Sequence, residues 1–301
     1  MELTILGCYS ATPRVNTHPT SQILNIKNNL FLIDCGEGTQ VQLRRYRIKF
    51  SRIKHIFISH LHGDHYFGLI GLISTFMLLG RETELHVYGP KGIKELILLQ
   101  LKLGKAWFNY PIIFHELENK ESELIFEDDK VTVHTVPLKH RIYTNGFVFR
   151  EKLGERRIDI SAVQNAKIDM SYYNKIKQGF DVENEVGELI PNQSITFDPD
   201  PPKSYAFCSD TQYFPECIPN IKDVTALYHE ATFLNEHEQM CKKTRHSTAE
   251  HAAKIAKEAN VGKLILGHYS TRYSNIEDFK NEASQIFKNV ELAKDGKVFV
   301  L

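Results

Sequence analysis

Ser59-His60-Leu61-His62-Gly63-Asp64-His65 is the stretch of sequence that decides the fold. It follows an apolar run, residues 53–58, that predicts a buried β-strand. A strand that ends here places the first two histidines on one side, and the turn at Gly63 brings Asp64 and His65 to a neighbouring point. Four imidazole and carboxylate donors are more than one tetrahedral zinc ion takes from a single segment. The stretch therefore predicts two adjacent metal ions, and a histidine-rich surface turn is the simpler alternative.

Two adjacent ions need further ligands, and the chain offers three at the ends of strand-like segments. These are His140, Asp210 and His268. Each of them alone is typical of a strand cap, but together they complete one site. Because the two oxygens of a carboxylate can bridge two cations, we expect Asp210 to be the shared ligand. One ion would take His60, His62, His140 and Asp210, and the other would take Asp64, His65, His268 and Asp210.

Length and composition are those of an ordinary globular enzyme. The chain has 301 residues, 42% of them hydrophobic and 25% charged, which suits one large domain with or without an insertion. Its start has no basic segment of the kind that opens a signal peptide, and its longest apolar run, residues 69–80, is too short to span a membrane. Five cysteines without framework spacing indicate reduced thiols. We therefore expect a cytoplasmic protein without membrane association.

Charge is unevenly distributed although the formal net charge is zero. Residues 44–54 hold six basic side chains and no acid, and residues 139–177 hold nine basic side chains against four acids. Residues 178–201 carry six acids and no base, which hides the excess in the sum. A basic run is often only a solvated helix face. Two such runs beside a predicted metal site favour a phosphate-bearing polymer as the substrate.

The order of elements predicts an α/β fold. Both halves of the chain contain short strand-like segments, followed by helical patterns. The expected strands are 3–5, 21–26, 30–34, 53–59, 85–88, 131–136, 195–197, 204–208, 226–229 and 263–266. The expected helices are 38–45, 67–79, 92–103, 247–259 and 275–287, of which the fourth begins with Ser247 as its cap and Glu250 three residues later. Two such halves imply two sheets packed face to face with helices outside and with every proposed ligand at one rim.

Residues 149–202 break this pattern. The segment begins with charged residues, continues with a weakly helical pattern at 158–177 and ends in an extended, proline-rich run. His140 precedes the segment and Asp210 follows it. We therefore expect a single domain over residues 1–301, with a flexible arm at about 150–200 inserted between two core strands.

Several motifs together resemble a known enzyme family. The H-x-H-x-D-H cluster, Asp34 at a strand end, and the three downstream ligands resemble the metallo-β-lactamase superfamily. A narrower set of segments resembles ribonuclease Z (tRNase Z) within that superfamily. These segments are Gly38-Thr-Gln-Val-Gln42, Phe67-Gly-Leu-Ile-Gly-Leu72, Tyr88-Gly-Pro-Lys-Gly92, His229-Glu-Ala-Thr-Phe233 and His246-Ser-Thr-Ala249. The resemblance extends over nearly the whole chain.

The resemblance implies a fold, an activity and partners. The fold is the metallo-β-lactamase αββα sandwich, two mixed sheets with helices outside. The activity is endonucleolytic removal of the 3′ trailer from precursor tRNA, which leaves a 3′-hydroxyl on the tRNA. Two zinc ions per subunit would serve it, and manganese or cobalt suits the same ligands. The family forms homodimers in which the arm of one subunit lies across the site of the other, and the helix at 67–79 is a candidate interface, with core packing as its alternative.

Three residues receive catalytic roles from the resemblance. Asp64 is both a metal ligand and the proton acceptor for the attacking water. His246 is the candidate that protonates the departing 3′-oxygen, and Glu230 orients its imidazole. His229 and His246 are alternatively ordinary polar residues of the core.

Two segments depart from the family pattern. The loop near the N-terminus keeps Pro13, Arg14 and Asn16 without the usual spacing, which puts the response to precursors that already encode CCA in doubt. The arm lacks the glycine-proline motif of the family. We expect it to bind the tRNA body nevertheless, through the basic residues Lys175 and Lys177 and the aromatic residues Tyr172 or Tyr173.

Two other functions compete with this prediction. A hydrolase of the same fold that cleaves a small-molecule ester, thioester or phosphodiester would explain the metal ligands but not the basic runs or the arm. An RNA-binding protein with an inactive site would have lost a ligand, and every expected ligand is present here.

Overall fold

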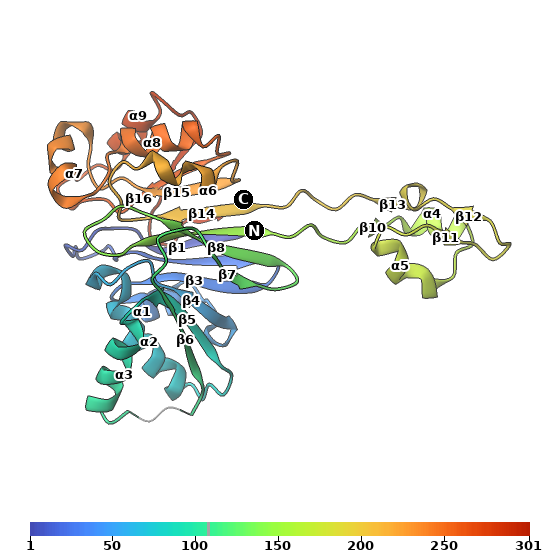
Figure 1. The fold of residues 1–301 in the computed structure, drawn as a ribbon, viewed down its shortest axis with the longest axis horizontal. Coiled ribbons are helices and arrows are strands. Elements are labelled where there is room, and N and C mark those ends of the chain that lie inside the picture. Colours follow the sequence, from blue (N-terminus) through green and yellow to red (C-terminus); the bar gives the residue numbers. More distant parts are fainter. Residues whose placement is uncertain (107–108) are drawn as a thin grey trace. The chain divides into compact units, whose positions relative to one another are not determined.

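The computed structural model describes residues 1–106 and 109–301. The chain divides into two compact units, one formed by Met1–Arg150 with Lys203–Leu301 and the other by Glu151–Pro202. In the larger unit two seven-stranded sheets lie face to face, and helices cover their outer surfaces (Figure 1). Both sheets mix parallel and antiparallel neighbours. The predicted αββα sandwich is confirmed.

The first sheet contains the N-terminal strands and has the order β18-β1-β2-β3-β4-β5-β6. Neighbours from β3 to β6 are parallel, so helical crossovers connect them, and these helices cover its outer face. The elements are β1 (Glu2–Gly7), β2 (Ser21–Ile26), β3 (Asn29–Cys35), α1 (Thr39–Arg45), η1 (Phe50–Arg52), β4 (Ile53–Phe57), α2 (Gly63–Leu78), β5 (Leu85–Pro90), α3 (Ile93–Leu103), β6 (Ile112–Leu117) and β18 (Val298–Val300).

The second sheet has the order β17-β16-β15-β14-β9-β8-β7, and its outer face is covered by α8 and α9 (Figure 1). Its elements, with the helices around it, are β7 (Leu124–Glu127), β8 (Val131–Pro137), β9 (Asn145–Glu151), β14 (Ser204–Cys208), η4 (Pro215–Cys217), α6 (Ile218–Ile221), β15 (Ala226–Glu230), η5 (Asn235–His237), α7 (Glu238–Thr244), α8 (Ala249–Glu258), β16 (Leu264–Gly267), α9 (Glu277–Ala283) and β17 (Val290–Leu292).

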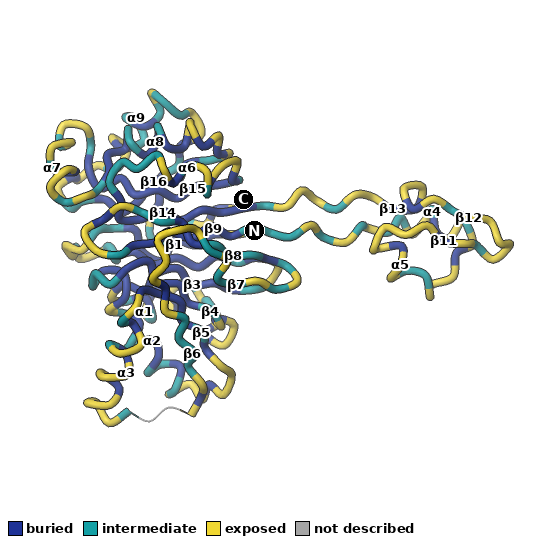
Figure 2. Tube along the Cα trace, viewed as in Figure 1, coloured by how far each residue is buried: buried dark blue, intermediate teal, exposed yellow. Residues whose placement is uncertain are grey.

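Alternate residues of the strands enter different parts of the core. Phe31 of β3 and Phe57 of β4 pack between the sheets, against Phe149 of β9. Leu32 and Ile56 point to the opposite face and pack with the helices α1–α3. The edge strands β6 and β7 are only partly buried, whereas the central strands of both sheets are buried, as Figure 2 shows. Because both faces of each sheet are covered, these strands read as continuous apolar runs in the sequence.

The start of helix α8 corrects one sequence prediction. Its N-cap is Thr248, whose side chain accepts a hydrogen bond from the backbone N–H of His251, and not the expected pair Ser247 and Glu250. The hydroxyl of Ser247 instead donates to the carbonyl oxygen of Thr211, 2.7 Å away. The hydroxyl of Ser247 is therefore engaged in a tertiary contact and does not cap α8, so the N-cap lies one residue later, at Thr248.

Helix α2 starts at Gly63, four residues before its predicted start. The sequence analysis also missed five strands of the two sheets: β6, β7, β9, β17 and β18. Strands β17 and β18 have three residues each, too few for a period-two pattern to emerge.

The unit Glu151–Pro202 has a small core of its own, built from Val163, Ile168, Ile176, Val182 and Ile195. Two short two-stranded ladders pair β10 with β13 and β11 with β12. The elements are β10 (Arg157–Ile158), α4 (Ile160–Asn165), η2 (Met170–Tyr172), α5 (Tyr173–Lys177), β11 (Val182–Glu183), β12 (Leu189–Ile190), η3 (Asn192–Ser194) and β13 (Thr196–Phe197). The segment expected to be weakly helical thus forms two short helices.

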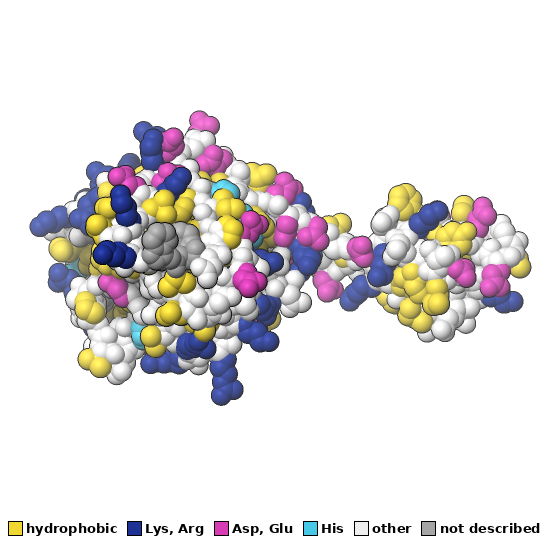
Figure 3. All heavy atoms as spheres, turned by 90° about the horizontal axis from the view of Figure 1, so that it is seen from below, with side chains coloured by type: hydrophobic (Ala, Val, Ile, Leu, Met, Phe, Trp, Pro, Cys, Tyr) yellow, Lys and Arg dark blue, Asp and Glu magenta, His cyan; other side chains and the backbone are white. Residues whose placement is uncertain are grey.

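Charged side chains of both signs are spread over the face of the larger unit seen in Figure 3. The smaller unit exposes apolar side chains, among them Met170 and Phe180. Throughout the described part of the chain, no helix combines the length and apolar character needed to cross a membrane.

Candidate metal centre

The connection from β4 to α2 carries the donors of the H-x-H-x-D-H cluster. His60 follows the strand, and His62 is the N-cap of α2. Asp64 and His65 lie in the first turn of that helix, so the helix and not a free turn fixes their direction. All four side chains therefore start from the same end of β4, at one rim of the sandwich.

The first group of donor atoms lies on one side of Asp210. Nε2 of His60 and Nε2 of His140 lie 3.0 and 3.2 Å from Nδ1 of His62. Oδ2 of Asp210 lies 3.5 Å from the first of these atoms and 3.8 Å from the second. Ligands about 2.0–2.1 Å from a tetrahedral ion lie about 3.3 Å apart, so these four atoms have the spacing of one ligand set.

The second group of donor atoms faces the other oxygen of Asp210. Oδ1 of Asp210 lies 3.1 Å from Nε2 of His65 and 3.2 Å from Nε2 of His268. Oδ2 of Asp64 lies 3.5 and 3.4 Å from the same two nitrogens. The structure thus brings all seven residues together, and the carboxylate of Asp210 belongs to both groups of four donors.

Hydrogen bonds behind the histidines determine which ring nitrogen faces the centre. Nδ1 of His65 donates to Asp34 over 2.6 Å, and Nδ1 of His140 donates to the carbonyl oxygen of Arg245 over 2.9 Å. Nδ1 of His268 lies 2.8 Å from the hydroxyl of Thr232, which itself donates to a carboxylate. Each of these three rings therefore has a proton on Nδ1 and turns Nε2 toward the centre, as metal-binding histidines do.

Three residues of the centre have left-handed backbone conformations. The φ angles are +55° at Asp34, +61° at Asp210 and +61° at His268. Such angles are uncommon for residues other than glycine, and they concentrate at functional sites because the surroundings must hold them. Each follows or ends a strand, where the turn of the backbone directs the side chain across the rim.

The ionisation of the donors suits divalent cations. Burial lowers the pKa of His60, of His62 and of His140, so these rings are neutral and have free lone pairs. Burial opposes ionisation of Asp210, but the neighbouring histidines outweigh it and hold its pKa well below the usual range. An anionic carboxylate among neutral imidazoles is the combination that zinc binds.

His65 provides an independent test of that fit. Burial alone would lower its pKa, but the carboxylates of Asp210, Asp64 and Asp34 raise it well above the usual range. Its Nε2 is buried and makes no hydrogen bond to any residue that the structure describes. A cation at this position would replace the proton, give Nε2 a partner and balance the carboxylates.

His246 and Glu230 form a pair beside the two donor groups. Nδ1 of His246 lies 2.7 Å from Oε1 of Glu230. Burial would lower the pKa of His246, but the charge and hydrogen bond of Glu230 outweigh it and raise the pKa to about 9. The carboxylate of Glu230 also accepts hydrogen bonds from the backbone N–H groups of Thr211 and Ser247. The imidazole is therefore held in place and protonated at neutral pH.

A cavity of about 550 Å³ opens onto this centre. His62, Asp64, Asp210, His246 and His268 reach it from one side, and Arg141 and Arg272 add positive charge that the sequence analysis did not single out. A cavity of this size with convergent polar groups is typical of a substrate site.

Arg14 and His229, which were noted in the sequence, do not direct their side chains to the candidate metal centre. The guanidinium of Arg14 donates to the carbonyl oxygens of Thr271 and Tyr273, so it supports the loop that lines the cavity. His229 is buried, and its Nδ1 donates to the carbonyl oxygen of Glu230, 2.7 Å away. Thr232 lies in the motif at residues 229–233, but its contact with Nδ1 of His268 was not predicted, because only the fold brings these two residues together.

Relatives match this chain over nearly its whole length. A ribonuclease Z from Bacteroides fragilis is 48% identical over 295 residues, which cover 98% of this chain and 97% of that protein. A ribonuclease Z from Porphyromonas gingivalis is 43% identical over 284 residues, which cover 94% and 93%. The chain belongs to the ribonuclease Z family. The resemblance inferred from the motifs is thereby confirmed.

Solved structures of the ribonuclease Z family agree with this assignment. The human tRNase Z, short form, is 27% identical with a TM-score of 0.73, covering 100% of this chain and 99% of that one. YhfI from Bacillus subtilis, a metallo-β-lactamase fold protein with a TM-score of 0.69, is 19% identical and shows the shared fold alone. A family model described as Anti-Pycsar protein Apyc1 matches residues 1–154, whereas the ribonuclease Z relatives extend over both sheets.

Proposed function

We propose that this protein is a zinc-dependent endoribonuclease that removes 3′ trailers from precursor tRNA and leaves a 3′-hydroxyl on the tRNA. Its membership of the ribonuclease Z family supports the activity and the substrate. The observation that carries the proposal is the position of Asp210, whose two oxygens face two separate groups of imidazole and carboxylate donors.

The donor set supports two zinc ions per subunit. His60, His62 and His140 would hold one, Asp64, His65 and His268 the other, and Asp210 both. When bound, such ions supply an activated water and neutralise charge on the phosphoryl oxygens. Manganese or cobalt suits the same ligands, so elemental analysis of the purified protein decides the metal.

Three side chains would move or position protons during hydrolysis. By family resemblance Asp64 accepts the proton of the attacking water, and its pKa is held well below the usual range despite burial, so the carboxylate is ionised. His246 donates its proton to the 3′-oxygen that leaves the phosphorus. Glu230 orients the ring through Nδ1, so Nε2 carries the proton toward the substrate cavity.

The decisive experiment incubates the purified protein with a 3′-extended tRNA and maps the cut. We expect one cut at the end of the acceptor stem, a 3′-hydroxyl on the tRNA, and loss of cleavage in Asp64→Ala. A parallel panel of bis(p-nitrophenyl) phosphate and thioesters tests the rival small-molecule hydrolase. Rapid thioester turnover with an intact precursor would reject the nuclease.

We also propose that the unit Glu151–Pro202 binds the tRNA body. Lys175 and Lys177 lie at the end of α5, and the ammonium of Lys175 is 5.7 Å from the ring centre of Tyr172. Arg156, by contrast, pairs with Asp198. Replacing both lysines by alanine should raise KM for precursor tRNA and leave bis(p-nitrophenyl) phosphate hydrolysis unchanged. An unaltered KM, also after deletion of residues 155–195, would remove the arm from tRNA binding.

A homodimer is proposed with α2 at its interface. The helix and its end expose Phe67, Leu78 and Leu79, with relative exposures of 52%, 80% and 51%. Light scattering should give twice the mass of the 34.7 kDa chain, and a glutamate at Leu78 should reduce it to the monomer. We place the protein in the cytoplasm, since its five cysteines are free thiols.

A further inference from the structure

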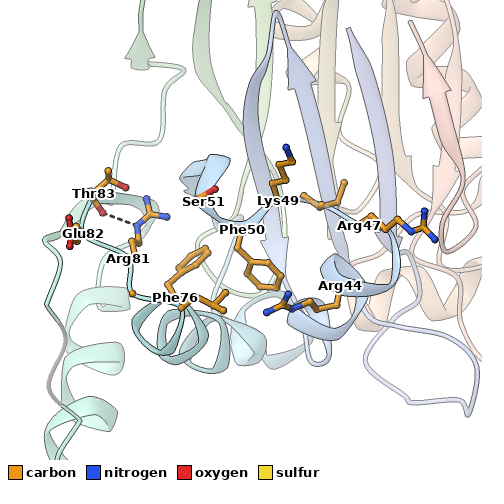
Figure 4. A pocket seen from close by; sticks show the side chains of 12 residues that line it. Arg44, Arg47, Lys49, Phe50, Ser51, Phe76, Arg81, Glu82 and Thr83 are labelled. Atoms are coloured by element: carbon orange, nitrogen blue, oxygen red, sulfur yellow. Dashed lines mark hydrogen bonds between the residues drawn. The ribbon is translucent and has the colours of Figure 1, made fainter.

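A second cavity, of about 770 Å³, lies at the end of α2 opposite the metal centre. Side chains around it come from α1, η1 and the segment after α2, and include Arg44, Arg47, Lys49, Phe50, Phe76 and Arg81 (Figure 4). Helix α2 begins at the metal centre and has 16 residues, which separates the two sites by about 24 Å. This cavity is therefore distinct from the candidate active site.

The cavity is strongly basic. It is lined by four cationic side chains and one acid, Glu82. Arg44, Arg47 and Lys49 are exposed, and none of them forms an ion pair with a residue that the structure describes. They belong to the run 44–54 that stood out in the sequence for having six basic residues and no acid. Unpaired cations around one hollow favour an anionic occupant.

Arg81 gives the cavity a rigid cationic wall. It is nearly buried, and its guanidinium donates to the carbonyl oxygens of Ile53, Thr83 and Glu84 over 2.7–2.9 Å. These three bonds fix the plane of the group. A guanidinium has five N–H donors, so further donors remain for a ligand.

Two buried aromatic rings form an apolar wall between the cations, with Phe50 7% and Phe76 1% exposed. Phe50 and Phe76 meet edge to face with ring centres 6.0 Å apart. The guanidinium carbon of Arg44 lies 4.9 Å from the ring centre of Phe50, and that of Arg81 lies 4.8 Å from the ring centre of Phe76. Figure 4 shows the two guanidinium groups on either side of this ring pair. The rings therefore hold the two guanidinium groups in place at the wall of the cavity.

Helix capping accounts for part of this arrangement. A basic side chain in the last turn of α1 stabilises the helix dipole, and both Arg44 and Arg45 occupy that turn. The φ of +57° at Arg47 belongs to the turn that ends α1, in which the N–H of Arg47 donates to the carbonyl oxygen of Arg44. Lys49 lies beyond this turn, so capping does not explain its place at the cavity. The cavity volume also falls in the range of about 300–1,000 Å³ that small ligands occupy.

We propose that this cavity binds a nucleoside phosphate, with the phosphate near the exposed Arg44 and Lys49 and the base against the apolar side chains that line the cavity. The ligand is either a free nucleotide or one nucleotide of the RNA substrate, and only the second source rests on the proposed function. A separation of about 24 Å is shorter than one turn of a nucleic-acid duplex, about 34 Å, so one RNA reaches both sites.

The test compares the double variant Arg44→Ala/Lys49→Ala with Arg45→Ala in the metal-loaded enzyme. All three side chains are exposed, and Arg45 is on the same helix but does not line the cavity, so it controls for loss of charge. Two assays separate the sources: steady-state cleavage of precursor tRNA at several salt concentrations, and equilibrium dialysis with AMP and ATP. Hydrolysis of bis(p-nitrophenyl) phosphate reports the metal centre itself.

If RNA is the source, the double variant raises KM for precursor tRNA about tenfold with kcat unchanged. The slope of log KM against log salt concentration then falls by about one to two. If a free nucleotide is the source, dialysis shows one equivalent less bound AMP or ATP than in Arg45→Ala, with KM for tRNA unchanged. Equal behaviour of both variants in both assays overturns the proposal. Should the wild-type enzyme not cut precursor tRNA, the proposed function fails, while dialysis still tests the cavity.

Discussion

Three properties occur together at Asp210 and at no other residue of the centre. It is buried, its two oxygens face different donor groups, and its backbone is left-handed. The left-handed conformation is tolerated best by asparagine, aspartate and glycine among the common residues. Aspartate alone of these supplies a bridging carboxylate, so backbone and chemistry impose the same residue at this position.

Replacement of His246 by asparagine tests its role as proton donor. We expect kcat for precursor tRNA to fall by about 10²–10⁴, since a protonated group no longer assists the departing 3′-oxygen. Hydrolysis of bis(p-nitrophenyl) phosphate should stay close to the wild-type rate, because nitrophenolate leaves without a proton. Metal content, measured by elemental analysis, serves as the control. Equal losses on both substrates would contradict the assigned role.

Asp34 supports the centre without facing it. Asp34→Asn keeps a residue that tolerates the φ of +55° but weakens the bond to Nδ1 of His65. Loss of such a supporting partner typically reduces metal affinity about 10–100-fold, and we expect that range here. Competition with a chromogenic zinc chelator measures it. Unchanged affinity would mean that the ring of His65 is oriented by packing alone.

At the scale of elements, α2 connects the metal centre with the first sheet. Its N-terminal turn carries Asp64 and His65, and its apolar side chains pack on the sheet. Close approach of the helix to the β3–α1 connection depends on Gly68, where an added Cβ would lie 2.1 Å from the carbonyl oxygen of Gly36. Gly68 of the motif at residues 67–72 thus sets the distance between helix and sheet.

Gly68→Ala should destabilise the protein by about 1–3 kcal/mol and displace the start of α2, because backbone atoms cannot yield. Gly71→Ala is the matched control, since its Cβ would meet the flexible side chain of Gln40. Urea unfolding gives the free energies, and elemental analysis gives the metal content. The expectation is wrong if both variants lose the same stability.

The paired strands β4 and β5 place His55 and His86 side by side, with ring centres 5.0 Å apart. Burial, aided by His86, lowers the pKa of His55 to about 4. The unfolded chain then binds a proton that the folded chain does not, so stability is complete above about pH 6.5 and falls as the pH drops toward 4.

This depression predicts a measurable effect of acid. We expect the protonation equilibrium of His55 to lower the free energy of unfolding by at most about 3 kcal/mol when the pH falls from 7 to 4. Denaturant unfolding of the wild type and of His55→Phe at both pH values isolates its contribution, because the other histidines are common to the two proteins. The variant should lose less stability on acidification. Parallel losses would show that His55 titrates normally.

At the scale of the whole molecule, the centre exists only where the two sheets meet. The first sheet supplies the cluster after β4, and the second supplies His140, Asp210 and His268. Ions bound between them would therefore connect the two halves of the larger unit. Without ions, buried carboxylates of Asp34, Asp64 and Asp210 lie close to one another.

Removal of the ions should consequently lower the stability of the larger unit. Ligands present at 100 to 1,000 times their dissociation constant contribute about 3–4 kcal/mol, and chelation removes this amount. Thermal unfolding before and after chelation, followed by readdition of zinc, measures the change. A melting temperature that falls on chelation and recovers when zinc is added back distinguishes the loss of bound metal from irreversible damage. A melting temperature insensitive to chelation would argue against ions between the sheets.

Local patterns determined much of this protein. The spacing of histidines after an apolar run defined the end of β4, and strand-like segments ending in His140, Asp210 or His268 indicated the remaining donors. These features are readable because they depend on neighbours in the sequence. The short strands β17 and β18 could not be predicted in this way, because they depend on long-range pairing. The cap of α8 could not be predicted either, because the contact between Ser247 and Thr211 decides it.

By itself the sequence determined the fold class and the family, and it predicted the candidate donors, since each is indicated by residue types at fixed spacing. Only the tertiary structure decided which nitrogen of each histidine faces the centre, because the acceptors behind them, Asp34, Thr232 and the carbonyl of Arg245, come from distant segments. It alone also gathered Arg44 and Arg81 around one pair of rings. Contacts between residues far apart in the chain leave no periodic trace in the sequence.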